Sequence, residues 1–244
     1  MKVSKNVMNL LALAGGLGIL GGVLRLLQGA FALDGRDLLI RGHVLTFGVL
    51  LVLGVTLVIL GGAVRKLDGS NRWEHNFQAS PLAAVGLLMG AVGILLTVLT
   101  GRNVATIWAV FALIAVGVLA VWAGCRYSGK PVPTLCPLGV CLFFLAHLVA
   151  NYRTWSADPQ TMDYLFDLLA AIFLMLFCYY CATFAAGIGS RRMQLATGLM
   201  AVALCLMTLA NTGWPWLYLG GSCLAGTNLC RISPMPKEVP HADS

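Results

Sequence analysis

Long apolar runs separated by short polar segments occupy most of the chain. A helix needs about 20 apolar residues to cross the hydrocarbon core of a bilayer, and seven runs meet that requirement. The predicted spans cover residues 7–27, 44–64 (with 38 as an alternative start), 81–99, 104–124, 136–152, 158–188 and 193–210. The pattern predicts an all-α fold, a polytopic transmembrane helix bundle of seven spans, with an eighth C-terminal span as an alternative.

A weaker apolar segment, 216–232, follows the seventh run. The motif Asn211-Thr-Gly-Trp-Pro-Trp216 separates the two, and its glycine and proline are expected to end the seventh helix. The segment is either an eighth span or an interfacial segment, because its tryptophans are typical of the membrane–water boundary. The last residues carry three prolines and predict a disordered polar tail. The chain is therefore divided into one transmembrane helical domain, 1–232, and a tail, 233–244.

Small residues recur at four-residue spacing within two of the spans. Ala14, Gly18 and Gly22 share one helix face, and Gly86 and Gly90 repeat the pattern in the third span. Faces of this kind allow another helix to approach closely. The neighbour is either a helix of the same chain or, as an alternative, a membrane-protein partner or a second copy packed on these Gly-rich faces.

Composition agrees with this pattern. Hydrophobic residues make up 59% of the chain and charged residues only 10%, against about 25% charged in soluble domains. The expected environment is the lipid bilayer. The net charge of +7 does not predict binding to nucleic acid, because no basic run is interleaved with aromatic residues.

The distribution of Lys and Arg predicts the orientation, since cytoplasmic loops carry an excess of both. With the N-terminus inside, seven spans place nine of them inside and seven outside, whereas eight spans place eleven inside and five outside. The eleven are Lys2, Lys5, Arg65, Lys66, Arg72, Arg126, Lys130, Arg191, Arg192, Arg231 and Lys237. We therefore expect an integral protein of the plasma (inner) membrane with a cytoplasmic N-terminus.

No catalytic motif stands out, so an enzyme is not predicted. The chain lacks H-E-x-x-H, and no Ser/His or Asp pair is placed convincingly. Cys178 and Cys181 spell C-x-x-C but lie within a predicted span, where cysteine packs as a small hydrophobic residue. Cys223 and Cys230 could pair if the C-terminal segment faces an oxidising compartment.

The strongest lead for a binding site is a polar cluster in the stretch 146–169. His147 and Asn151 share one helix face, and Asp163 and Asp167 share another, near a helix start where the helix dipole favours negative charge. With the N-terminus inside, these residues fall in the outer half of the membrane together with arginines of the first two spans. The candidate ligand-binding residues are Arg25, Arg41, His147, Asn151, Asp163 and Asp167.

Ionisable residues inside a membrane are costly and commonly functional. We therefore expect a small polar or ionic solute to be bound or transported through this outward-facing layer, with Asp167 paired to Arg25 or Arg41. Neither a metal nor a cofactor is part of this hypothesis. In one alternative, His43 and His147 ligate a b-type haem. In the other, the protein is a non-catalytic membrane scaffold, and its polar residues lie only at the headgroup level.

Overall fold

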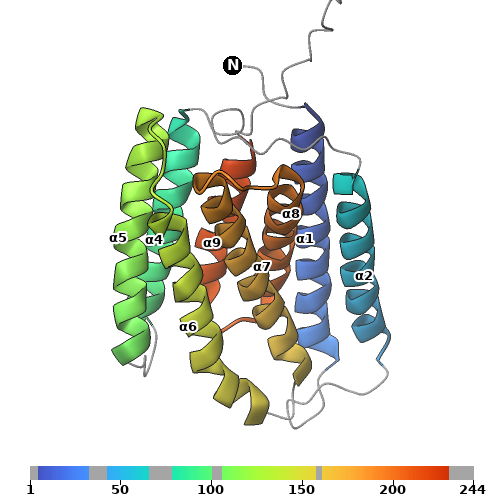
Figure 1. Ribbon diagram of the computed structural model, residues 1–244. Helices are drawn as coiled ribbons and strands as arrows, with labels where there is room; N and C mark the ends of the chain where they lie inside the picture. The colour runs from blue at the N-terminus through green and yellow to red at the C-terminus, as the bar shows by residue number, and fades with distance from the viewer. Residues whose placement is uncertain (1–4, 33–42, 66–78, 101–105, 158–160, 231–244) are drawn as a thin grey trace, which may run out of the picture.

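Eight long helices and one short 3-10 turn form the described part of the computed structural model (Figure 1). The structure describes residues 5–32, 43–65, 79–100, 106–157 and 161–230, without the side chains of 5, 106–107, 153–157 and 161–163. The elements are α1 (Lys5–Phe31), α2 (Val44–Arg65), α4 (Pro81–Thr100), α5 (Thr106–Ser128), α6 (Leu135–Ala157), α7 (Thr161–Ala185), α8 (Arg191–Thr208), η1 (Leu209–Asn211) and α9 (Pro215–Cys230).

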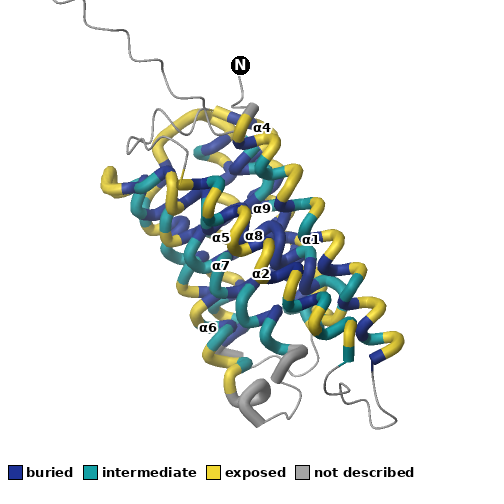
Figure 2. The backbone as a smooth tube through the Cα atoms, turned by 90° about the vertical axis from the view of Figure 1, so that its right-hand side faces the viewer, coloured by how far each residue is buried: buried dark blue, intermediate teal, exposed yellow. Residues whose placement is uncertain are grey.

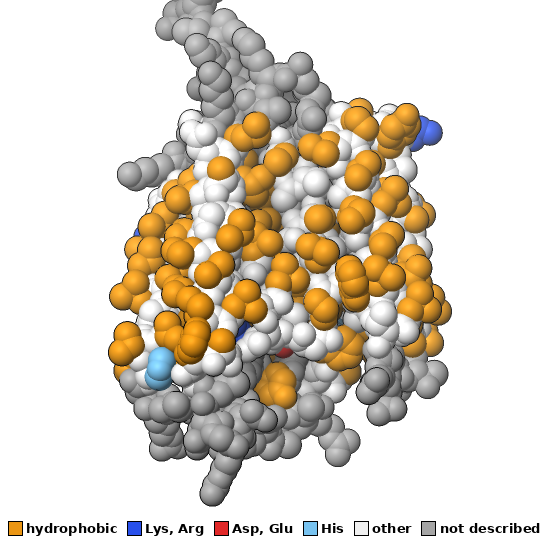
Figure 3. All heavy atoms as spheres, turned by 180° about the vertical axis from the view of Figure 1, so that it is seen from behind, with side chains coloured by type: hydrophobic (Ala, Val, Ile, Leu, Met, Phe, Trp, Pro, Cys, Tyr) orange, Lys and Arg blue, Asp and Glu red, His pale blue; other side chains and the backbone are white. Residues whose placement is uncertain are grey.

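Seven of these helices are long and apolar enough to cross a membrane, which confirms the predicted helical transmembrane bundle. Large apolar side chains such as Val58 and Leu99 point away from the bundle, and hydrophobic side chains cover the face seen from behind in Figure 3. Such a surface is stable only against lipid. The predicted boundaries agree to within a few residues, although α7 ends earlier than expected because Gly187 takes a positive φ of 80° shortly after it.

Consecutive helices form four antiparallel hairpins, α1–α2, α4–α5, α6–α7 and α8–α9 (Figure 1). The α8–α9 hairpin lies at the centre. Helix α8 packs against α1, α2 and α7, while α9 packs against α4 and α8. In Figure 2 the buried residues concentrate along these inner helices, and the outer faces of the surrounding helices are exposed.

Helix α9 resolves the alternatives for the C-terminal segment. It is a helix within the bundle, not an interfacial segment, because α4 and α8 pack along it and most of its residues are buried. It runs back to the end of the bundle where α1 begins (Figure 1). Its 16 residues span about 24 Å at 1.5 Å per residue, somewhat less than the full hydrocarbon core. The predicted tail, 233–244, lies outside the described residues.

Both small-residue faces contact helices of the same chain. A Cβ added at Gly18 would lie 2.8 Å from the Ala203 carbonyl oxygen of α8, and one added at Gly90 would lie 2.9 Å from the Leu224 side chain of α9. Only glycine permits this approach. These two faces are therefore filled within the chain and are not docking surfaces for a partner or a second copy.

All eight cysteines are free thiols, and the C-x-x-C pair, Cys178 and Cys181, is fully buried. Cys223 and Cys230 both lie on α9, seven residues apart. That spacing separates them by about 10 Å along the helix axis, beyond the reach of a disulfide. The alternative pairing of these two residues is therefore wrong.

Candidate functional site

The structure buries three of the six predicted ligand-binding side chains. Relative exposure is 1% for Arg25, 0% for His147 and 3% for Asp167. Asn151 is half-buried. Arg41 lies outside the described residues, and Asp163 belongs to α7 without a described side chain. The three buried residues lie in spans α1, α6 and α7, toward the end of the bundle opposite the N-terminus (Figure 1).

Asp167 lies against the break between α8 and α9. The Thr212 hydroxyl donates a hydrogen bond of 2.7 Å to the Asp167 carboxylate. The Tyr218 hydroxyl of α9 donates to the Asp167 backbone carbonyl at 3.1 Å. On the other side of the break, the Thr208 hydroxyl donates to the Phe166 carbonyl at 3.2 Å. Hydroxyl groups on both sides of the break thus hold one turn of α7. We call this group of residues the Asp167 layer; it consists of Phe166, Asp167, Thr208, Thr212 and Tyr218.

Arg25 reaches the same turn of α7 from α1. Its guanidinium carbon lies 4.2 Å from the centroid of the Phe166 ring, a distance typical of a cation–π contact. The positive charge of α1 therefore lies beside the residue that precedes Asp167. Pairing of Asp167 with Arg25 or Arg41 stays a prediction, and Thr212 is one partner of the carboxylate.

His147 is enclosed by aromatic rings from three parts of the chain. Ring centroids lie 5.9 Å away for Trp108 of α5, 6.4 Å for Phe143 of α6 and 5.5 Å for Trp214, which precedes α9. Asn151, one turn further along α6, lies 3.2 Å from Nδ1 of His147 and donates to the His147 carbonyl at 2.8 Å. The predicted pair on one helix face therefore interacts, inside an apolar setting.

The segment between α8 and α9 connects His147 to Asp167. The backbone N–H of Trp214 donates to the Thr212 hydroxyl at 3.1 Å, and that hydroxyl donates to Asp167. The Trp214 ring meets His147 edge-on at 84°. Thr212 and Trp214 were not among the predicted site residues. The sequence signal for them was the helix break itself, which places irregular backbone at the depth of a buried carboxylate.

The structure does not bring the two candidate haem ligands together. His43 lies at the start of α2, where its Nδ1 accepts the Leu45 backbone N–H at 3.3 Å. Helix α2 packs on α1 and α8, whereas α6, which carries His147, packs on α5 and α7. The two helices lie on opposite sides of the bundle in Figure 1.

A second set of buried polar side chains lies at the end of the bundle where α1 begins. Arg126 of α5 and Arg191 of α8, which the sequence placed at or beyond helix ends, are 2% and 4% exposed. The Gln194 amide donates to the Cys181 sulfur at 3.5 Å. These residues join α5, α7 and α8 within the core, and their burial depends on neighbouring helices that the sequence does not reveal.

The fold and its buried polar residues define an integral membrane protein built as a helical bundle. Comparisons of the chain with protein-family models, with curated proteins and with solved structures find no match. The function therefore has to be argued from the site itself.

Proposed function

We propose that the protein binds or transports a small polar or ionic solute and that the Asp167 layer holds it. The observation that carries the proposal is the burial of an Asp carboxylate within a membrane-spanning helix, at 3% exposure. An ionisable group at this depth is expensive, and such groups commonly mark solute or proton pathways. A purely packing role would be served at lower cost by an apolar residue.

The helix break beside Asp167 supports the same proposal. Residues 209–214 leave the α-helical conformation next to the carboxylate. Irregular backbone at membrane depth is tolerated where it is enclosed by protein or lines a site, and broken helices in transporters present backbone groups to their substrates. The Thr212 O–H is donated to the carboxylate, and the other lone pairs of the carboxylate offer acceptors for one polar solute.

The orientation that we propose has the N-terminus on the cytoplasmic side of the plasma (inner) membrane. It rests on eleven Lys and Arg inside against five outside when α9 returns the chain to its starting side. In this orientation the Asp167 layer lies in the outer half of the membrane.

Epitope tags at both ends of the chain test this orientation. Both tags are expected to be inaccessible to antibody in intact cells and accessible after permeabilisation. A third tag inserted between α4 and α5 should be accessible in intact cells, because α4 ends and α5 begins at the opposite end of the bundle (Figure 1). Tags found on opposite sides would show that α9 does not cross the membrane. If both terminal tags are exposed in intact cells, the orientation is the reverse of the one proposed.

Solute binding is tested by thermal unfolding of the purified protein against a panel of small cations, amines, amino acids and carboxylates. A ligand at about 100 times its Kd stabilises the folded state by about 2.7 kcal/mol, which raises the Tm by several degrees. We expect at least one solute class to do so for the wild type and not for Asp167→Asn. Asparagine preserves the shape and can still accept the Thr212 hydrogen bond, so the variant removes chiefly the charge.

Thr97→Val provides the control for this experiment. Thr97 is buried in α4, and its hydroxyl donates only to the Gly93 carbonyl of the same helix, at 2.7 Å. This variant should respond to the solute as the wild type does. If Asp167→Asn responds equally well, the carboxylate is not part of the binding site and the proposal is wrong.

A further inference from the structure

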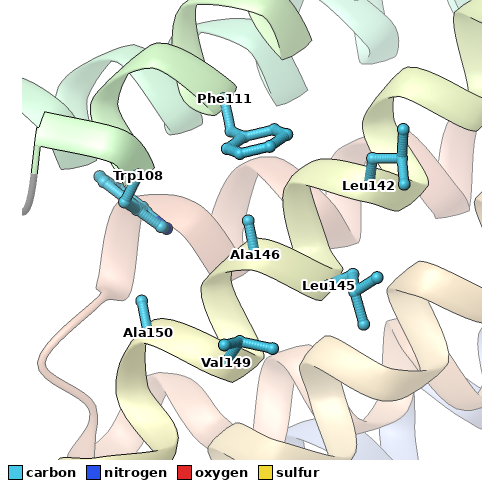
Figure 4. A pocket seen from close by; sticks show the side chains of 7 residues that line it. All are labelled: Trp108, Phe111, Leu142, Leu145, Ala146, Val149 and Ala150. Atoms are coloured by element: carbon cyan, nitrogen blue, oxygen red, sulfur yellow. The ribbon is translucent and has the colours of Figure 1, made fainter.

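A membrane-facing groove runs between α5 and α6, with a volume of about 460 Å³ (Figure 4). Trp108 and Phe111 of α5 form one wall. Ala146 and Ala150, one turn apart on α6, leave the space that larger side chains would fill. The opposite side is lined by Leu142, Leu145 and Val149, whose exposed fractions lie between 46% and 67%. The lining is almost entirely apolar and opens toward the surface that contacts lipid.

We infer that this groove holds one acyl chain of a membrane phospholipid. Its lining extends along α6 from Leu142 to Ala150, which is about 12 Å at 1.5 Å per residue. One leaflet of the hydrocarbon core is about 15 Å thick. Trp108 lies near the start of α5 and Leu142 lies deeper in α6, so the groove runs from the membrane boundary toward the bilayer centre. An acyl chain has the same length, direction and polarity.

A polar solute fits less well. It would lose its hydrogen bonds to water and find no polar side-chain group along this lining apart from the buried indole N–H of Trp108. A single hydrocarbon chain is thin and flexible enough to follow the groove and to contact both walls.

The groove adjoins the aromatic cluster around His147. Trp108 is only 4% exposed, and its ring packs on both His147 and Trp214 on the inner side. A bound acyl chain therefore supports the outer side of a ring whose inner side contacts the segment that binds Asp167. Binding of an acyl chain in the groove does not depend on the binding of a solute at the Asp167 layer. In the orientation proposed above, the acyl chain belongs to the outer leaflet. Only this assignment depends on that orientation.

The test uses phosphatidylcholine with a diazirine in the middle of one acyl chain, reconstituted with the full-length protein and photolysed. Adduct positions are mapped by peptide mass spectrometry. We expect labelling of the groove residues of α6 to exceed labelling of the exposed face of α2, at Leu51, Val55 and Val58, several-fold. This comparison is made within the wild-type protein, so it does not depend on the folding of any variant.

Filling the groove provides the second arm of the test. Ala146→Phe should reduce labelling of α6 several-fold. Ala120→Phe adds the same volume to an exposed position of α5 outside the groove and should leave the labelling unchanged. Equal labelling of α2 and α6 in the wild type, or unchanged labelling in folded Ala146→Phe, would each overturn the inference. A failed solute screen would not affect it.

Discussion

Replacing Gly93 with alanine is expected to destabilise the bundle by about 1–3 kcal/mol, a typical cost of overpacking. A Cβ at this position would overlap the Trp216 carbonyl oxygen and lie 3.0 Å from the Cα of Gly220. Both contacts are to backbone, which cannot rotate away as a side chain can. Because α4 and α8 pack along α9, the strain cannot be relieved by moving α9 alone. The measurement is the free energy of unfolding in mixed micelles by titration with a denaturing detergent.

Gly117→Ala is the matched control for Gly93→Ala. Gly117 lies in α5, and a Cβ added there meets nothing within 4 Å. Alanine is favoured over glycine in a helix by up to about 1 kcal/mol in water, so this variant should be neutral or slightly more stable. If both variants unfold alike, close backbone contact between α4 and α9 is not what holds the central hairpin in place.

The number and bounds of the helices follow largely from the hydropathy pattern. Which helices lie next to one another inside the bundle does not. Each predicted span corresponds to a helix with similar bounds, because an apolar run of membrane length has few other stable conformations. The spacing of Gly18 and Gly90 predicted close helix contacts. It did not predict that the neighbours would be α8 and α9, because hydropathy carries no information on which helices are adjacent.

The weak C-terminal segment shows the same limit. Its glycines lower its hydropathy, yet they allow α9 to pack deeply against α4, as Gly220 does with its close approach to Gly93. A central helix shielded by other helices needs less apolar surface than one that faces lipid. Burial of Arg126 and Arg191 was missed for a related reason, since arginine near a span end usually reaches the membrane boundary.

Part of the site could be predicted from residue type alone. His147 and Asp167 attract notice because ionisable residues are rare in apolar segments. Thr212, Trp214 and Tyr218 do not, because hydroxyl and aromatic residues are common at membrane boundaries. Their role became visible only when the α8–α9 break was placed beside α7, since the bonds of Thr212 and Tyr218 to Asp167 cross more than 40 positions of sequence.

Replacing Thr212 with valine is expected to destabilise the protein by about 1.5–3 kcal/mol, the range for a hydrogen bond to a charged group. Valine matches threonine in shape and removes the hydroxyl, which donates to Asp167 at 2.7 Å and accepts the Trp214 backbone N–H at 3.1 Å. The buried carboxylate then loses a partner that stabilises its charge. The unfolding free energy in mixed micelles measures the effect, and the same experiment in the Asp167→Asn background measures how much of it depends on the charge.

Thr208→Val is the control that separates the charge from hydrogen bonding in general. Thr208 is 1% exposed, and its hydroxyl donates to two backbone carbonyls, those of Leu204 at 2.7 Å and Phe166 at 3.2 Å. Loss of these neutral bonds should cost about 0.5–1.5 kcal/mol. In the Asp167→Asn background the cost of Thr212→Val should fall into the same range. If Thr212→Val costs no more than Thr208→Val in the wild-type background, the Thr212 hydroxyl does not act by stabilising a charge on Asp167.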